Sequence, residues 1–254
     1  MAGFSTRDRY SAVLLDMDGV VTDTAGIHAE CWKRLFDEFR EKRTAQNAAP
    51  FGPFDLNTDY KLHVDGKPRY QGVADFLKSR GIVLPEGTPE DSPAEATVCG
   101  LGNRKNQLFN ERIASAGARA YPGTVAFLGY VRRTGIKSAV VTSSRNADAV
   151  LHAAKLADLF DVCVDENVLV EHGLSGKPAP DSFLKAAEML GVPPDRAVVI
   201  EDALSGVRAG ARGGFALVIG VARKDNAEEL KAQGAHLVVK DLAELLPEPS
   251  EAMR

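Results

Sequence analysis

The fold is decided by the stretch LLDMDGV, residues 14–20. Its apolar beginning continues the run from Ser11 and is typical of a buried strand. Asp16 and Asp18 leave that strand together, and Gly19 lets the backbone turn tightly behind them. Like charges a few ångströms apart repel by about 4 kcal/mol at an effective dielectric near 20, so a divalent cation or a raised pKa must relieve them. The stretch therefore predicts a strand that ends in a charged site.

The C-terminal half of the chain alternates short β-branched apolar runs with amphipathic segments. The apolar runs predict strands over residues 138–142, 162–165, 197–200, 216–219 and 236–239. Helical patterns lie between them, over residues 146–157, 181–190, 205–212 and 227–233. Strands and helices in strict turn imply crossover connections and a parallel, doubly wound sheet.

The region from Ile27 to Ala116 shows helical patterns, over residues 29–39, 72–79 and 103–114, and no convincing buried strand. Residues 44–59 between the first two contain Pro, Gly and Asn, which favour an irregular excursion. We therefore predict an α/β fold with two parts. Residues 1–26 and 117–254 form a Rossmann-like catalytic core with a doubly wound parallel sheet, and residues 27–116 form an inserted helical cap domain.

Composition excludes several classes of function. The chain has 254 residues, 44% of them hydrophobic and 26% charged, as in ordinary globular proteins. Its formal net charge of -4 gives no reason to expect nucleic acid or an anionic membrane as partner. The three cysteines, at positions 31, 99 and 163, form no CxxC pair and predict reduced thiols. No apolar run is long enough for a membrane span, so we expect a cytoplasmic protein.

Polar side chains follow the predicted strands at the sheet edge where α/β proteins bind ligands. Four of them are acids, which supply the oxygen ligands that Mg²⁺ prefers. The others are hydroxyls and a lysine on a loop stiffened by prolines, and these groups suit phosphate oxygens. The candidates are Asp16, Asp18, Thr142, Ser143, Lys177, Glu201 and Asp202.

Each candidate also has a structural interpretation. The DxDG turn could cap a helix or bind calcium, although an EF-hand loop would need further oxygen ligands and a late Glu. Asp202 could be a helix N-cap, and Thr142 and Ser143 could serve the same purpose. Most lysines are solvated surface charges, as Lys177 could be. No single candidate indicates a particular function, and only the whole set does.

As a set, these segments resemble the haloacid-dehalogenase-like superfamily, because they follow its order along the chain. The resemblance implies a magnesium-dependent phosphotransferase in which Asp16 is the nucleophile that forms an aspartyl-phosphate. It implies that Asp18 is the general acid and base, and that Lys177 and Thr142, with Ser143, hold the transferring phosphate. Mg²⁺ would be held by Asp16, Asp18, Glu201 and Asp202.

The resemblance extends to the β-phosphoglucomutase-like branch over nearly the whole chain. Three segments outside the core motifs support it: DMDGVVTDTA at 16–25 with His28 after it, VDGKPR at 64–69 and GNRKN at 102–106. In that branch they place Thr24, His28, Arg69 and Lys105 around the substrate. The implied reaction interconverts β-glucose 1-phosphate and glucose 6-phosphate through a 1,6-bisphosphate, in a protein expected to be a monomer.

Two alternatives stay open. A sugar-phosphate phosphatase of the same superfamily would use the same core motifs, and a non-catalytic module on this fold would belong to another class. The chain also departs from the branch, since Asp65 stands at the cap-loop lysine, with Lys67 two residues later. Thr142 stands where the branch has serine. The first departure concerns sugar specificity rather than phosphoryl chemistry.

Overall fold

The computed structural model describes residues 9–223 and 225–247. The chain divides into two compact units: the first ends at Asp23 and resumes at Ala118, and the second is Thr24–Gly117. Within the described residues, no helix has both the length and the apolar character that crossing a bilayer requires.

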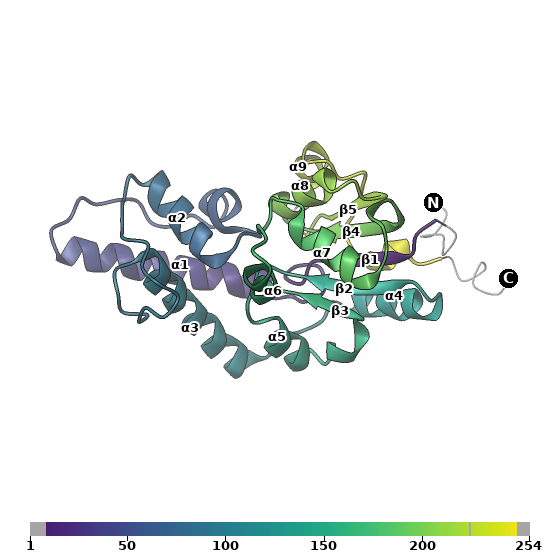
Figure 1. Ribbon diagram of the computed structural model, residues 1–254. Coiled ribbons are helices and arrows are strands. Elements are labelled where there is room, and N and C mark those ends of the chain that lie inside the picture. The colour runs from purple at the N-terminus through teal and green to yellow at the C-terminus, as the bar shows by residue number, and fades with distance from the viewer. Residues whose placement is uncertain (1–8, 224, 248–254) are drawn as a thin grey trace. The chain divides into compact units, whose positions relative to one another are not determined.

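The first unit is built on a six-stranded sheet in the order β3-β2-β1-β4-β5-β6, and every pairing is parallel (Figure 1). The predicted α/β fold with a parallel sheet is therefore confirmed, and each strand lies within two residues of its predicted limits. The strands are β1 (Ala12–Leu15), β2 (Lys137–Val141), β3 (Val162–Val164), β4 (Ala197–Glu201), β5 (Leu217–Val221) and β6 (Leu237–Val239).

Every residue of β1, at the centre of the sheet, is buried. Helices therefore cover both faces of the sheet. Successive side chains of a strand point to opposite faces. Ala12 and Leu14 belong to the core cluster that contains Phe183 of α7 (Asp181–Leu190) and Val207 of α8 (Leu204–Arg212). The remaining helices of the unit include two that the sequence did not predict, α4 and α6. The helices are α4 (Pro122–Arg133), α5 (Ala147–Ala153), α6 (Glu166–Glu171), α7 (Asp181–Leu190), α8 (Leu204–Arg212) and α9 (Ala227–Ala232).

The second unit is helical and contains α1 (Ala25–Ala45), α2 (Arg69–Ser79) and α3 (Val98–Ala116). A π-helix, Tyr60–Val64, which was not predicted, precedes α2. All three helices begin before their predicted starts. In α3, glycines at positions 100 and 102 weaken the helical signal, since glycine lowers helix propensity. The structure compensates there with an N-cap, since the Thr97 hydroxyl accepts a hydrogen bond from the amide of Gly100 at 2.9 Å.

An aromatic cluster forms the core of this helical unit. The ring of Phe36 on α1 lies 3.9 Å from that of Phe76 on α2 and 5.3 Å from that of Phe54, measured between centroids. Phe54 belongs to the irregular excursion at 44–59 and is buried. Phe54 therefore anchors the otherwise mainly exposed excursion to the core of the unit, and its burial contributes about 1.5–3 kcal/mol.

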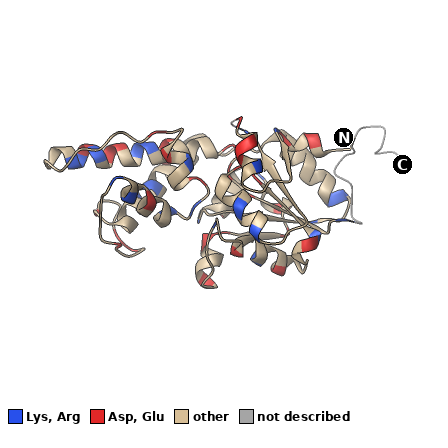
Figure 2. Ribbon diagram, turned by 90° about the horizontal axis from the view of Figure 1, so that it is seen from above, with Lys and Arg blue, Asp and Glu red and all other residues tan. Residues whose placement is uncertain are grey.

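The outer face of α1 carries charges of both signs, and Figure 2 shows blue and red bands alternating along this long helix. Four of these charges form two pairs one turn apart, Lys33 with Asp37 at 2.7 Å and Arg34 with Glu38 at 2.9 Å. Such pairs stabilise a helix by about 0.2–0.5 kcal/mol each. These charges therefore support the helix, and some also bind neighbouring segments, since Asp37 accepts the amide of Phe54 at 3.2 Å.

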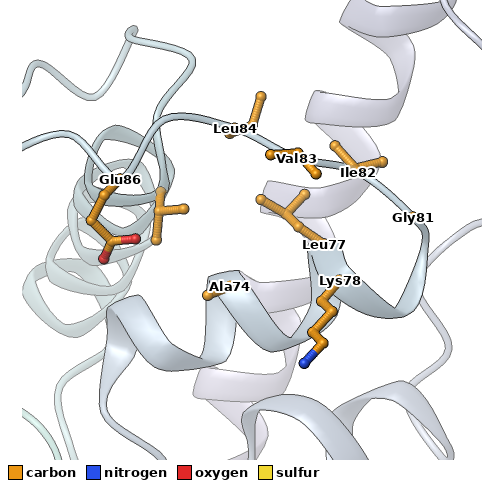
Figure 3. Close-up of a pocket in the computed structure, with 9 residues that line it drawn as sticks. Ala74, Leu77, Lys78, Gly81, Ile82, Val83, Leu84 and Glu86 are labelled. Atoms are coloured by element: carbon orange, nitrogen blue, oxygen red, sulfur yellow. The ribbon is translucent and has the colours of Figure 1, made fainter.

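A pocket of about 300 Å³ lies inside the helical unit, between the end of α2 and the segment that follows it (Figure 3). Its walls are mainly apolar and include Leu77, Ile82, Val83 and Leu84. Among the described residues that line it, none is a predicted substrate residue. An apolar groove of this kind does not suit a sugar phosphate.

Candidate active site

The carboxyl ends of β1 and β4 bring the predicted acids together. Leu15 pairs with Ile200 in the register of these strands, and the amide of Asp16 donates to the Ile200 carbonyl at 2.9 Å. Asp16 and Glu201, 185 positions apart in the chain, therefore leave the sheet side by side. One carboxylate oxygen from each of Asp16, Glu201 and Asp202 lies within 4.8 Å of the others, and all three residues are buried.

Lys177 lies at the centre of this group and is 1% exposed. Its ammonium contacts the Asp16 carboxylate, lies 2.8 Å from Glu201 Oε1 in an ion pair, and donates to the Val141 carbonyl at 3.1 Å. These three oxygens equal in number the three protons of an ammonium. Lys177 is therefore a buried member of the site and not a solvated surface charge.

The charges of this group act on one another's pKa values. Burial raises the pKa of the Asp16 carboxyl well above its ordinary value; Lys177 opposes that rise, while Glu201 and Asp18 reinforce it. Burial by itself would lower the pKa of Lys177, but the Asp16 and Glu201 carboxylates outweigh it and raise that pKa. Lys177 consequently stays charged at neutral pH. Three buried carboxylates face one ammonium, and this excess of negative charge suits a divalent cation.

Two glycines leave space for the carboxylates. Gly19 has a φ of +97°, and a Cβ atom there would overlap the carboxylate of Asp202. A Cβ atom on Gly206, in the first turn of α8, would overlap Oε1 of Glu201. The other oxygen of Glu201 accepts the amide of Ala203 at 2.8 Å. The donor set and the glycine cradle fit Mg²⁺, which binds carboxylate oxygens at about 2.0–2.1 Å.

Thr142 joins the acids from the end of β2. Its hydroxyl lies 3.5 Å from Oδ2 of Asp18 and accepts the amide of Ser144 at 3.1 Å. Thr142 is buried, whereas Asp18 and Ser143 are half-buried. The first unit thus brings together the predicted core residues that the sequence distributes over four segments.

A neighbouring ion pair was missed from the sequence. Arg145 follows the Thr142 segment, and its Nε lies 3.3 Å from Oε2 of Glu166, a buried carboxylate at the start of α6. The available signal was the position of Glu166 just after the strand at 162–164, at the same edge of the sheet. The pair ties the loop after β2 to the loop after β3.

The helical unit holds four predicted substrate residues, His28, Arg69 and Lys105 of the predicted cap and Thr24, which was predicted to lie in the core segment 1–26. Lys105 is 5% exposed, and its ammonium contacts Nδ1 of His28. The same ammonium lies 5.2 Å from the ring of Trp32 and 5.0 Å from that of Phe109, on which His28 stacks at 4.1 Å. His28 and Lys105 therefore form one cluster inside the unit.

Thr24 is buried and precedes α1, with its carbonyl accepting the amide of His28 at 2.9 Å. Arg104, next to Lys105 in sequence, has a different role. Its guanidinium donates to both carboxylate oxygens of Glu38, at 3.1 and 3.2 Å, and so ties α3 to α1. Of the two basic residues in the GNRKN segment, only Lys105 belongs to the cluster with His28.

Arg69 is the first residue of α2 and is half-buried. Its guanidinium lies 5.1 Å from the ring of Tyr70, and its Nε is buried without a hydrogen-bond partner among the described residues. Gly102 of α3 packs closely here, since a Cβ atom on it would lie 2.6 Å from the Tyr70 ring. This packing fixes the start of α2, and with it the backbone of Arg69.

Lys67 is engaged within the cap loop. Its ammonium donates to Asp75 on α2 at 2.7 Å and to the carbonyl of Leu62 in the π-helix at 3.0 Å. It therefore connects the two elements on either side of the loop. Asp65 is half-buried in that loop, and its amide donates to the Tyr60 carbonyl at 2.9 Å.

Comparison with known proteins agrees with this geometry. The profile of the hydrolase family described as haloacid dehalogenase-like hydrolase matches residues 10–214. A β-phosphoglucomutase of Mycobacterium bovis is 47% identical over 242 residues, which cover 94% of this chain and 92% of that protein. A phosphorylated carbohydrates phosphatase of Thermotoga maritima is 29% identical, with 90% of this chain and 94% of that protein covered.

Among solved structures, a β-phosphoglucomutase of Clostridium difficile has the same fold, with a TM-score of 0.70, 24% identity and 96% of both chains covered. The chain belongs to the haloacid dehalogenase-like hydrolase family. It is an enzyme of the phosphotransferase or phosphatase type. The predicted resemblance to the β-phosphoglucomutase-like branch is confirmed.

Proposed function

We propose that this enzyme is a phosphomutase that interconverts β-glucose 1-phosphate and glucose 6-phosphate through a 1,6-bisphosphate. The observation that supports the phosphoryl chemistry most is the buried group of Asp16, Lys177 and Glu201 at the strand ends. The choice of substrate rests on the 47% identity to a β-phosphoglucomutase over nearly the whole length of both chains.

Asp16 is the proposed nucleophile. One of its carboxylate oxygens attacks phosphorus, the bond from phosphorus to the sugar oxygen breaks, and an aspartyl-phosphate forms. Asp18 gives its proton to the departing sugar oxygen and later takes the proton of the hydroxyl that attacks the aspartyl-phosphate. General acid and base assistance of this kind accelerates a reaction by about 10²–10⁴-fold.

The other core residues hold the phosphate and neutralise charge. Lys177, Thr142 and Ser143 are proposed to bind the oxygens of the transferring group. Mg²⁺ is proposed to be held by Asp16, Asp18, Glu201 and Asp202, a set supported by the excess of carboxylates and by the glycine cradle. When bound, the cation supplies charge neutralisation and orientation of the phosphate.

The helical unit, Thr24–Gly117, is proposed to be the cap over the sugar. Thr24, His28 and Lys105 contact the substrate in this proposal, and Arg69 binds the phosphate that is not being transferred. The buried Nε of Arg69 supports this role, because it has no hydrogen-bond partner within the described part of the chain and an unmade hydrogen bond is costly. A closed cap would also exclude water, which competes with the sugar hydroxyl for the aspartyl-phosphate.

A sugar-phosphate phosphatase is the second candidate, and two observations favour it. Asp65 stands at the position of the branch's cap-loop lysine, and a phosphatase of phosphorylated carbohydrates is 29% identical. The two reactions differ only in whether a sugar hydroxyl or water accepts the phosphoryl group.

One paired assay decides between them. The protein is given β-glucose 1-phosphate with a trace of 1,6-bisphosphate, and formation of glucose 6-phosphate and release of phosphate are followed together. We expect glucose 6-phosphate to form well ahead of phosphate. Phosphate release without glucose 6-phosphate would establish the phosphatase instead.

The enzyme is further proposed to act as a monomer in the cytoplasm. Both compact units come from one chain, and together they carry every proposed site residue. The three cysteines are free thiols, as expected in a reducing compartment.

A further inference from the structure

Arg223 lies two residues after the end of β5, on a loop that carries none of the motifs above. Its guanidinium Nε donates to the carbonyl of Gly19 at 3.0 Å, across 204 positions of sequence. Gly19 is the next residue after Asp18, the proposed general acid. Arg223 is therefore a side chain from a distant strand end that holds the backbone of the catalytic loop.

The guanidinium of Arg223 is itself held on two other sides. Its Nη1 donates to the Lys240 carbonyl at 3.0 Å and to the Asp241 carboxylate at 2.9 Å. Its Cζ lies 3.7 Å from the centroid of the Tyr121 ring, within the range of a cation–π contact. The side chain is 16% exposed. A guanidinium with this many contacts has little freedom, so it fixes the atom to which it donates.

Gly19 is a position where small displacements matter. Its backbone has a φ of +97°, and its Cα packs against the carboxylate of Asp202 so closely that no Cβ would fit. Its amide donates to the carbonyl of Thr22 at 2.8 Å, which closes the turn. A shift of Gly19 would therefore displace the backbone next to Asp18 and would also change the packing against the Asp202 carboxylate.

Other contacts near this loop come from other directions. The Val20 carbonyl accepts the hydroxyl of Thr124 on α4 at 2.7 Å, and the Met17 carbonyl accepts the amide of Thr22 at 2.9 Å. The first ties the loop to α4, and the second lies within the loop itself. Arg223 connects the loop, through the Gly19 carbonyl, to the segments that follow β5 and β6.

We propose that Arg223 is a positioning residue for phosphoryl transfer, which holds the Asp16–Gly19 loop in its reactive geometry through the Gly19 carbonyl. It acts through the backbone and does not touch the substrate. The inference rests on the proposed role of Asp16. Because the loop serves both half-reactions, loss of Arg223 slows transfer from a sugar phosphate and from a small phosphate ester alike.

The test compares Arg223→Met with a matched control, Arg208→Met. Methionine keeps much of the apolar length over Tyr121 but cannot donate to Gly19. Arg208 is an exposed arginine of the same unit that donates twice to one oxygen of Gln233, at 2.8 and 2.6 Å, away from the loop. Two quantities are measured on each variant: kcat and KM for both substrates, and hydrogen–deuterium exchange of the peptide that covers residues 16–23.

For Arg223→Met we expect kcat to fall about 10- to 100-fold on both substrates, since a misplacement near 1 Å can cost that much. KM should stay within about threefold, and exchange should accelerate in residues 16–23 but not across the sheet; a purely structural role would not produce this split. The control should keep wild-type values. If kcat of Arg223→Met stays within about threefold of the control, or if its loss is matched by faster exchange across the whole sheet, the proposal is overturned.

Arg223→Lys covers the case in which the methionine variant does not fold. An ammonium keeps the charge but lacks the planar fork, so it cannot span the Gly19 carbonyl and Asp241 while it stacks on Tyr121. We expect a loss in kcat of about threefold or more, again with faster exchange of residues 16–23. Wild-type kcat and exchange in this variant would also overturn the proposal. Asp16→Asn is assayed beside it to separate the two proposals. Activity in Asp16→Asn would refute the nucleophile, whereas an inactive Asp16→Asn beside a fully active Arg223→Met would refute only the positioning role.

Discussion

Each of the two units contains a buried lysine, and the side chains that surround these two lysines differ. In the sheet unit, Lys177 forms ion pairs with the carboxylates of Asp16 and Glu201 and so belongs to a network of opposite charges. In the helical unit, Lys105 contacts an imidazole, that of His28, and lies near the rings of Trp32 and Phe109. One lysine balances acids, and the other lies in an aromatic surrounding.

This difference indicates a division of labour. A lysine that neutralises carboxylates keeps a cluster of acids together before any phosphate arrives. A lysine beside aromatic rings gains only about 0.5–2 kcal/mol from each cation–π contact, and such contacts leave room for an anion to bind as well. The sheet unit is therefore suited to chemistry on a phosphate and the helical unit to recognition of one. The predictions that follow test this contrast, beginning with the largest expected effect.

The nucleophile gives the largest effect. Asp16→Asn removes the attacking carboxylate while keeping its shape, so turnover of both a sugar phosphate and a small phosphate ester should fall by about 10³-fold or more. Steady-state assays measure this, and circular dichroism checks the fold. The control is Asp148→Asn, whose carboxylate is largely exposed. Turnover within about tenfold of wild type would exclude Asp16 as the nucleophile.

Removal of the metal should have the next largest effect on activity, and this effect should be reversible. Activity should disappear in excess chelator and return with Mg²⁺, whereas Ca²⁺ should restore it poorly because it takes more ligands in looser geometry. Mg²⁺ should also raise the melting temperature, because a ligand at 100 times its Kd stabilises by about 2.7 kcal/mol. Asp202→Asn should abolish that shift. Full activity in chelator, or an unchanged shift in Asp202→Asn, would contradict the proposed site.

Lys177 tests the sheet side of the contrast. Lys177→Met leaves the buried carboxylates of Asp16 and Glu201 without their cation, and breaking such a pair costs about 3–5 kcal/mol. The loss is measured by chemical denaturation in chelator. Lys185→Met on α7 is the control, because it removes an ion pair with Glu188 at 3.2 Å that is worth about 0.3–0.5 kcal/mol. Equal losses in the two variants would show that the network contributes no special stability.

Arg69 tests the helical side. If its guanidinium binds the distal phosphate, Arg69→Ala should lower the efficiency of isomerisation about tenfold or more, since a charge-assisted hydrogen bond contributes about 1.5–3 kcal/mol. Hydrolysis of a small phosphate ester should be spared, because that substrate has no second phosphate. Arg69→Lys should recover only part of the loss.

The control for Arg69 is Arg112→Ala, which removes a half-exposed arginine whose ion pair with Glu30 spans 3.8 Å. It should leave both reactions unchanged. An equal loss of both reactions in Arg69→Ala would assign Arg69 to general phosphate binding or to the fold, and would remove the main support for a mutase.

The contrast between the units also explains what the sequence could predict. Asp16, Thr142 and Glu201 end strands of one parallel sheet, and parallel strands deliver their carboxyl ends to one edge. Their meeting therefore follows from the topology alone. Alternation of apolar and amphipathic runs was enough for that topology, since it predicted each strand within two residues.

The helical unit and Arg223 were less predictable for physical reasons. Helix faces are set by packing among side chains such as Phe36, Phe54 and Phe76, and no short motif encodes such packing. The enclosure of Lys105 by rings depends on that packing. The contact from Arg223 to Gly19 joins two loops 204 positions apart. A lone arginine on a loop carries no periodic or motif signal that would reveal such a partner.

The smallest expected effect concerns Lys67, which stands two residues after the position of the branch's cap-loop lysine. If Lys67 replaced that lysine, Lys67→Met would lose a contact with the substrate, and Asp75→Asn would leave the contact in place. The structure instead shows Lys67 bound to Asp75 at 2.7 Å and to the Leu62 carbonyl at 3.0 Å. We therefore expect both variants to raise KM for the sugar phosphate by a similar factor, about two- to fivefold, as a surface ion pair of up to about 1 kcal/mol allows.

A double-mutant cycle separates the two roles of Lys67. In the double variant the effects should not add, because both changes break the same contact. The KM for the sugar phosphate is measured in the wild type, the two single variants and the double variant, with a small phosphate ester as the control substrate. A rise of tenfold or more in Lys67→Met alone, with Asp75→Asn at the wild-type value, would make Lys67 a ligand of the sugar phosphate. The helical unit would then recognise its anion with a lysine from the cap loop in addition to Arg69 and Lys105.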